Sequence, residues 1–245
     1  MTAVVPYFGY ARSGQAAQPT HPHRCEHGGG IDGDGGHRPP GHRRLARRAE
    51  GFFHIPVDGL TAVPTLCRAL AARLPAGVVV VSPDEGRFKA ATEYGRLLGA
   101  PVAVLHKSRE NGASTRVIKV VGEVQGRPCL LIDDMITTGG TLAGALQALL
   151  QAGARAEIYI AATHGLFVDG ARAKLSHPAI RGIYVTDSVT ATTSDWPELS
   201  VVSLAPLLGE TIRRLCAGQP LPDLNERAIA GAESPPATDQ RLHNI

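Results

Sequence analysis

The chain has 245 residues, a formal net charge of +3 and 43% hydrophobic residues, enough for one or two α/β domains with a buried core. No window is apolar enough to span a membrane, and Met1 leads into a strand pattern and not a basic and apolar signal, so we expect a cytoplasmic protein without a membrane partner. The cysteines show no paired spacing and are expected to be reduced: Cys25, Cys67, Cys129 and Cys216.

From residue 51 onward, the hydrophobic pattern predicts strands that alternate with helices. In chain order we expect a helix at 60–73, a strand at 77–82, a helix at 86–99, a strand at 101–105, a β-hairpin arm at 115–123, a strand at 128–133, a helix at 141–152, a strand at 156–162, a helix at 168–175, a strand at 182–186 and a helix at 204–216. This alternation is typical of a parallel sheet with helices on both faces. Residues 218–245 are polar and are expected to form a disordered tail.

Residues 13–50 do not fit this pattern. They contain eight glycines, five histidines and six arginines against four acids, and Ile31 and Leu45 are their only large aliphatic residues. No core can form from this composition, so we expect disorder. The alternation of His21, His23, Cys25 and His27 could bind zinc, but it lacks the spacing of structural zinc sites. The basic run 42–48 has no accompanying aromatic or recognition motif, so we expect no nucleic-acid partner.

The segment 129–142, Cys-Leu-Leu-Ile-Asp-Asp-Met-Ile-Thr-Thr-Gly-Gly-Thr-Leu, is the most informative stretch of the chain. A buried strand ends on two carboxylates, Asp133 and Asp134, which are placed to accept hydrogen bonds from vicinal ribose hydroxyls. The following loop supplies hydroxyl donors, glycines that allow close approach of an anion, and the N-terminus of a helix. We therefore predict a sugar-phosphate site formed by Asp133, Asp134, Thr137, Thr138, Gly139, Gly140 and Thr141.

This segment resembles the phosphoribosyl-binding motif of type I phosphoribosyltransferases, and its surroundings resemble the ribose-phosphate pyrophosphokinase (PRPP synthetase) family. The stretch 80–87 is similar to that family's pyrophosphate loop, and 105–109 to its mobile catalytic loop. Further similar blocks are 163–166, 185–188, 5–12 and 51–58. The resemblance implies a remnant of an ATP-side domain at 1–58, a phosphoribosyltransferase-like domain that binds ribose 5-phosphate at 59–217, and the tail at 218–245.

The resemblance also implies the reaction and its residues. ATP and D-ribose 5-phosphate would give AMP and 5-phosphoribosyl 1-diphosphate, with Mg²⁺ as the cofactor and a homo-oligomer as the assembly. Asp84 would hold the metal, because Mg²⁺ prefers carboxylate oxygen. Lys107 and Arg109 would stabilise the transferred pyrophosphoryl group, and Arg12 would contact the nucleotide. His164 and Asp187 lie at later strand ends. Each could contact a ligand or form hydrogen bonds with neighbouring backbone, and the sequence leaves both interpretations open.

A change of reading frame offers an account of residues 13–50. The stretch 42–48 can be encoded as CAC CGT CGA CTT GCA CGC CGG, which reads Thr-Val-Asp-Leu-His-Ala-Gly from the second base. That sequence closely resembles the block with the magnesium-binding histidine that PRPP synthetases carry before their Gly-Phe-Phe sequence. We therefore expect 13–50 to be frame-shifted and the chain to be truncated at its N-terminus relative to the family.

Taken literally, the chain departs from the family on its nucleotide side. The family's leader and the histidine before Gly51 are missing, Ser13 to Gln15 replace the expected continuation after Arg12, and Thr137 and Ser108 stand where many members have an acid and an arginine. These departures place catalytic activity in doubt. They favour as an alternative a non-catalytic subunit or decayed copy that assembles with intact PRPP synthetase. A base phosphoribosyltransferase is the third alternative, against which the family blocks at both ends of 5–58 argue.

Overall fold

A computed structural model describes residues 2–9, 57–109, 116–168, 170–191 and 195–221. Its elements, in chain order, are α1 (Val63–Ala71), β1 (Val79–Ser82), the 3-10 turn η3 (Glu85–Arg87), α2 (Phe88–Leu98), β2 (Val102–Arg109), β3 (Arg116–Val121), β4 (Cys129–Ile136), α3 (Gly140–Gln151), β5 (Ile158–Gly165), α4 (Ala171–Leu175), β6 (Ile180–Thr186), β7 (Leu199–Val202) and α5 (Ala205–Cys216).

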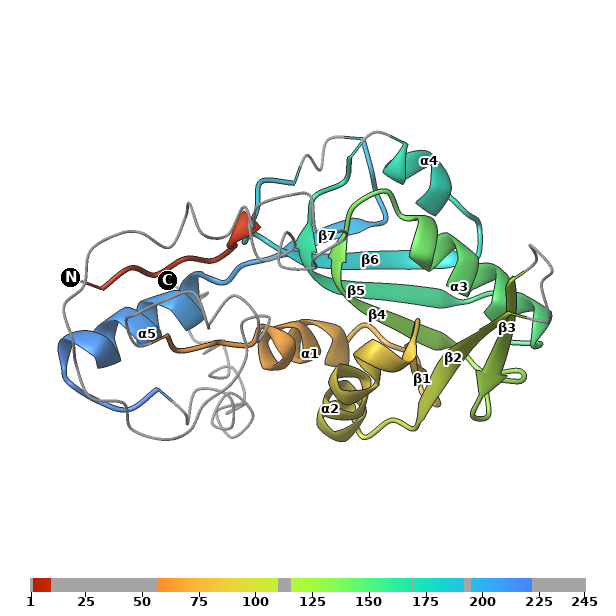
Figure 1. Ribbon diagram of the computed structural model, residues 1–245, viewed down its shortest axis with the longest axis horizontal. Coiled ribbons are helices and arrows are strands. Elements are labelled where there is room, and N and C mark those ends of the chain that lie inside the picture. The colour runs from red at the N-terminus through yellow and green to blue at the C-terminus, as the bar shows by residue number, and fades with distance from the viewer. Residues whose placement is uncertain (1, 10–56, 110–115, 169, 192–194, 222–245) are drawn as a thin grey trace, which may run out of the picture.

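The strands form a seven-stranded sheet with the order β3-β2-β1-β4-β5-β6-β7 (Figure 1). Every neighbouring pair is parallel except β2 and β3, which form an antiparallel hairpin arm at one edge. The predicted α/β class, with a mostly parallel sheet and helices on both faces, is confirmed.

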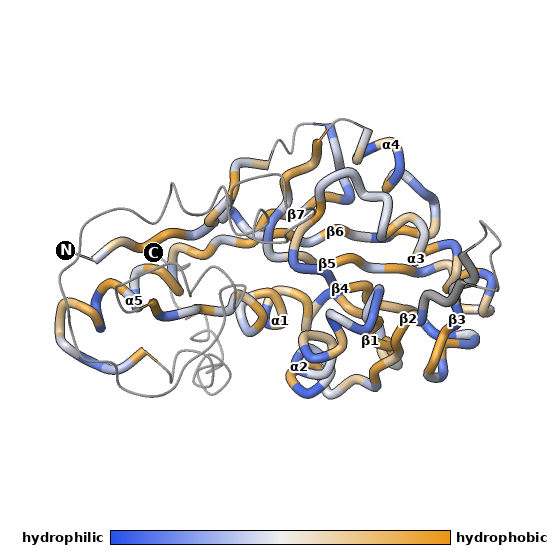
Figure 2. The backbone as a smooth tube through the Cα atoms, viewed as in Figure 1, coloured by the Kyte–Doolittle hydropathy of each residue, from blue (hydrophilic) through white to orange (hydrophobic). Residues whose placement is uncertain are grey.

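The core has two halves because the buried strands carry apolar side chains on both faces of the sheet. On β4, Leu131 packs toward α3 and α4, whereas Leu130 and Ile132 pack toward α1 and α2. Figure 2 shows the central strands in the hydrophobic colours along most of their length. All these leucines and isoleucines are fully buried, and each contributes about 1.5–3 kcal/mol to folding.

Several predicted elements differ from the observed ones in their bounds. β2 continues to Arg109 and β4 continues to Ile136, so these strands extend past the predicted ends at residues 105 and 133. The predicted helix at 86–99 begins as the turn η3, and α4 covers only Ala171–Leu175. The short strand β7 was not predicted. It lies at the sheet edge with Val201 exposed, so its sequence lacks a continuous apolar run.

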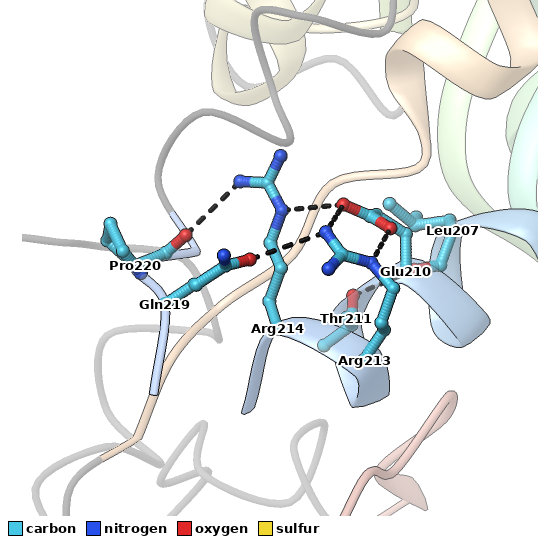
Figure 3. A network of polar contacts seen from close by, with 7 residues as sticks. All are labelled: Leu207, Glu210, Thr211, Arg213, Arg214, Gln219 and Pro220. Carbon is cyan, nitrogen blue, oxygen red and sulfur yellow. Dashed lines mark hydrogen bonds and ion pairs between the residues drawn. The ribbon is translucent and has the colours of Figure 1, made fainter. Parts of the chain in front are cut away.

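The C-terminal end of α5 is held by a polar network that centres on Glu210 (Figure 3). Its carboxylate accepts hydrogen bonds from Arg213 Nε at 2.7 Å and from Arg214 Nε at 2.8 Å. Arg214 also donates to the carbonyl of Pro220, and Arg213 donates to the side chain of Gln219. The two arginines therefore join the last turns of the helix to the residues that follow it.

Candidate active site

The crevice of the sheet lies between the carboxyl ends of β1 and β4. From β1 the chain passes to α2 on one face of the sheet, and from β4 it passes to α3 on the other face. Because the two connections leave in opposite directions, the strand ends are left open between them, and ligands of open α/β sheets bind at such switch points. The residues predicted to bind the sugar phosphate and the metal all lie on these two connections or at the end of β4.

Asp133 and Asp134 lie within β4, which continues to Ile136, whereas the predicted strand ended at residue 133. The side chain of Asp133 is 13% exposed and that of Asp134 is 37% exposed. Arg87 from η3 contacts both carboxylates: its Nη2 donates to Asp134 Oδ2 at 2.5 Å, and its Nε lies 3.5 Å from Asp133 Oδ1. The structure thus brings the predicted acid pair together with a cation to which sequence reasoning gave no role.

The protonation of Asp133 is unusual. Burial, followed by its hydrogen bond and charge interaction with Asp134, raises the pKa of the Asp133 carboxyl from 3.8 to about 7, while Arg87 acts in the opposite direction. The backbone N–H of Asp134 donates to Asp133 Oδ1 at 2.8 Å, which also favours the ionised form. A carboxyl whose pKa is raised in this way is typical of functional sites.

The loop 137–141 leads from β4 directly into α3, whose first residue is Gly140. Gly139 has a φ of 70°, in the left-handed region that suits glycine. Backbone hydrogen bonds join the start of this loop to the chain after β5. Leu166 N and Phe167 N donate to the Ile136 carbonyl, and Val168 N donates to the Thr137 carbonyl. Thr138 and Thr141 are exposed at the N-terminus of α3, where a hydroxyl can reach an anion, and the backbone N–H of Gly140 donates to Thr138 Oγ1 at 3.5 Å.

Asp84 lies in the connection after β1. It caps η3 by accepting a hydrogen bond from the backbone N–H of Arg87 at Oδ1, over 3.1 Å. The hydroxyl of the buried Ser82 donates to the Asp84 carbonyl at 2.6 Å. The described residues contain no group of three or more histidine, cysteine or acidic side chains that could enclose a metal ion. A single carboxylate nevertheless fits Mg²⁺, because that ion keeps several waters and shares its ligands with substrate phosphates.

Lys107 and Arg109 lie on β2, in the arm that it forms with β3. Lys107 is opposite Ile118, and Arg109 is opposite Arg116. The backbone here is a paired strand, although the stretch 105–109 resembles a mobile loop. The preceding residue of β2, His106, forms a hydrogen bond from Nδ1 to Glu85 Oε1, which joins the arm to η3.

Two further residues named from the sequence are Arg12 and Asp187. Arg12, the predicted nucleotide contact, and the segment 13–50 lie outside the described residues. Asp187 accepts hydrogen bonds from Ser203 Oγ and Leu204 N, each at 2.7 Å, so its carboxylate holds the start of α5. Of the two interpretations left open for Asp187, the structure shows contact with neighbouring backbone.

His164 lies at the end of β5, next to Met135 of β4. Its Nδ1 is 2.7 Å from Ser188 Oγ, and its ring lies 4.8 Å from that of Tyr7. Burial lowers the pKa of His164, whereas the negative charge of Asp134 acts in the opposite direction. Tyr7 thus places the N-terminal segment beside the carboxyl end of β5, a contact that no local sequence pattern indicates.

The fold and the crevice define an α/β protein of the phosphoribosyltransferase-like class. A family described as the phosphoribosyl synthetase-associated domain matches residues 111–225. The crystal structure of phosphoribosylpyrophosphate synthetase from Mycobacterium smegmatis superposes with a TM-score of 0.71 at 33% identity, over 87% of this chain and 70% of that one.

Curated relatives point to the same family. A ribose-phosphate pyrophosphokinase from Brucella melitensis is 36% identical over 233 residues, 91% of this chain and 73% of the relative. One from Corynebacterium efficiens is 44% identical over 170 residues, 68% of this chain and 52% of the relative. This chain therefore belongs to the ribose-phosphate pyrophosphokinase family, and it spans about half the length of the Corynebacterium relative. No helix in the described part of the chain is long and apolar enough to cross a membrane.

Proposed function

We propose that this chain binds D-ribose 5-phosphate in the crevice between β1 and β4, and that it performs the pyrophosphoryl transfer for which its relatives are named. The observation that carries the proposal is the adjacency of Asp133 and Asp134, at the end of β4, to a threonine- and glycine-rich loop that opens into the N-terminus of α3. Carboxylates suit sugar hydroxyls and a helix N-terminus suits a phosphate. One ligand that carries both groups is a sugar phosphate.

The ligand would lie with its phosphate in the loop 137–141. Thr137, Thr138 and Thr141 would donate from their hydroxyls, and Gly139 and Gly140 would let the backbone N–H groups approach the anion. The ribose hydroxyls would donate to Asp133 and Asp134. This orientation would direct the 1-hydroxyl of the sugar toward the connection that follows β1.

In the reaction, the oxygen of the ribose 1-hydroxyl attacks the β-phosphorus of ATP. The bond between that phosphorus and the bridging oxygen of the α-phosphate breaks, so AMP leaves and the hydroxyl proton is released. Lys107 and Arg109 would stabilise the charge on the transferred group, because electrostatic stabilisation supplies most of the catalysis in such transfers. Arg12 would contact the nucleotide.

Mg²⁺ would neutralise phosphate charge during this transfer, and Asp84 would hold it. The Asp84 carboxylate suits a metal ion that also binds phosphates. Its Oδ1 caps η3, which fixes the side chain beside the crevice. We assign the sugar-phosphate unit to residues 59–217 and an ATP-side unit to residues 1–58. Assembly into a homo-oligomer and a cytoplasmic location are further parts of the proposal.

The test separates binding from catalysis. The purified full chain is titrated with ribose 5-phosphate in a calorimeter, then incubated with ATP, ribose 5-phosphate and Mg²⁺, and AMP and 5-phosphoribosyl 1-diphosphate are quantified by mass spectrometry. We expect Lys107→Gln to lower turnover about 100-fold and to leave sugar binding intact. Glu198→Gln, on the loop before β7, is the matched surface control. Absence of ribose 5-phosphate binding would overturn the proposal, and binding without turnover would favour a non-catalytic subunit.

A further inference from the structure

Arg87 connects the two sides of the crevice. It belongs to η3, which follows β1, and its guanidinium reaches across to the end of β4. The contact with Asp134 is short, with Nη2 2.5 Å from Oδ2, and Nε lies 3.5 Å from Asp133 Oδ1. Within the described part of the chain, no other ion pair reaches either carboxylate.

The acid pair needs such a partner. Successive side chains of a strand point to opposite faces, and Asp133 and Asp134 are successive residues of β4. When both are ionised, their negative charges also repel each other. A guanidinium presents several N–H donors in a rigid fork, so one arginine can engage both carboxylates and draw them toward the same side.

Arg87 is itself held in place by its own loop. Its backbone N–H donates to Asp84 Oδ1 at 3.1 Å, and the Asp84 carbonyl accepts from the hydroxyl of Ser82, which is fully buried in β1. The neighbouring acid, Glu85, is engaged by His106 of β2. A continuous path of hydrogen bonds therefore runs from the core of β1 through Asp84 and Arg87 to the acid pair of β4.

We propose that Arg87 is a positioning residue for the sugar site, which orients Asp133 and Asp134 so that the ribose hydroxyls meet fixed acceptors. This inference rests on the proposed function, because it takes ribose 5-phosphate as the ligand. Arg87 acts on the sugar through the carboxylates, and the phosphate of the ligand lies at the loop 137–141, beyond the acid pair. Removing Arg87 should therefore weaken the recognition of ribose and leave the recognition of phosphate unchanged.

The experiment is a double-mutant cycle read by calorimetry on the full chain. Arg87→Gln, Asp134→Asn and the double variant are titrated with ribose 5-phosphate and, separately, with inorganic phosphate. We expect each single variant to weaken ribose 5-phosphate binding roughly tenfold, as the loss of one hydrogen bond to a charged group does. The double variant should lose less affinity than the two single losses combined, because part of the effect of Arg87 runs through Asp134. Affinity for inorganic phosphate should stay unchanged throughout.

Two further variants make the result specific. Arg87→Lys keeps the cation and should recover part of the lost affinity. Arg155→Gln is the matched control, because Arg155 Nη2 also lies 2.5 Å from a carboxylate oxygen, that of Glu157. This ion pair lies at the amino end of β5, away from the carboxyl ends of the strands. This variant should bind both ligands like the unmodified chain.

The outcomes separate the inference from the function on which it rests. Additive losses in the double variant, or a loss of inorganic phosphate binding in Arg87→Gln, would show that Arg87 contacts the ligand itself and would overturn the positioning role. Unchanged ribose 5-phosphate binding in Arg87→Gln would overturn it as well. If the unmodified chain binds no ribose 5-phosphate, the proposed function fails, and the inference fails with it.

Discussion

Gly139 packs directly against Leu175 of α4. A β-carbon at position 139 would lie 3.1 Å from Leu175 Cγ, and the φ of Gly139 is +70°. The loop that we propose for phosphate binding is thus fixed by a close approach that only glycine permits at this backbone angle. The helix α4 serves as the support for that loop, although it is remote in sequence.

Replacing Gly139 by alanine should therefore cost stability and weaken phosphate binding. We expect the free energy of unfolding to fall by about 1–3 kcal/mol, because the left-handed conformation and the contact with Leu175 both oppose a β-carbon. Urea unfolding measures this change. Gly144→Ala is the control: position 144 lies within α3, a β-carbon there would meet no atom within 4 Å, and alanine favours the helix. A loss of stability in Gly144→Ala equal to that in Gly139→Ala would contradict this account.

The raised pKa of Asp133 predicts a pH dependence of stability. Because the folded pKa of about 7 exceeds the ordinary value of 3.8, the folded state binds more protons than the unfolded state between these values. The contribution of Asp133 is thus complete below pH 4 and is lost as the pH rises through 7. In the unmodified chain we expect the free energy of unfolding to fall by on the order of 1–3 kcal/mol as the pH rises from 4 to 7. This decline should be absent in Asp133→Asn.

Urea titrations at several pH values, on the unmodified chain and on Asp133→Asn, test this expectation. Asp187→Asn is a useful comparison, because Asp187 also lies at a strand end but accepts hydrogen bonds from Ser203 and Leu204. Its replacement should destabilise the start of α5, because these two hydrogen bonds are lost. Identical slopes for the unmodified chain and Asp133→Asn would show that Asp133 ionises in its usual range.

The network around Glu210 predicts a local effect on α5. Hydrogen bonds from Arg213, followed by those from Arg214, lower the pKa of Glu210 to about 2, so its contribution is present above pH 4.5 and is lost as the pH falls through 2. At neutral pH, Glu210→Gln should speed amide hydrogen exchange in the last turn of α5. Glu198→Gln should leave this exchange unchanged, and equal exchange in both variants would refute a role for the network.

The described cysteines should differ sharply in reactivity. Burial raises the pKa of Cys67 to about 12 and that of Cys129 to about 11, so neither forms the reactive thiolate at neutral pH. Cys216 is exposed and free. Alkylation with iodoacetamide, followed by peptide mass spectrometry, should label Cys216 in the native protein, and Cys67 and Cys129 only in urea. Early labelling of Cys129 would indicate that β4 opens in the native state.

Sequence reasoning predicted the acid pair of β4 and the loop that follows it because their signal is local. A strand, two acids, a glycine-rich loop and a helix follow one another within 129–151, and each follows from a short-range preference. The same reasoning ended β4 too early at residue 133, since carboxylates inside a strand contradict a purely apolar pattern. It missed β7 because an edge strand is half exposed.

The sequence by itself determined the α/β class, the alternation of its elements and the acid pair with its loop, because periodicity and turn chemistry act between near neighbours. Tertiary structure alone decided that Arg87 lies against Asp133 and Asp134, that Leu175 supports Gly139, and that Tyr7 lies against His164. These contacts join residues that are far apart in the sequence. The contact of Arg87 follows from the order β3-β2-β1-β4-β5-β6-β7, which sets the ends of β1 and β4 side by side although a long stretch of chain separates them.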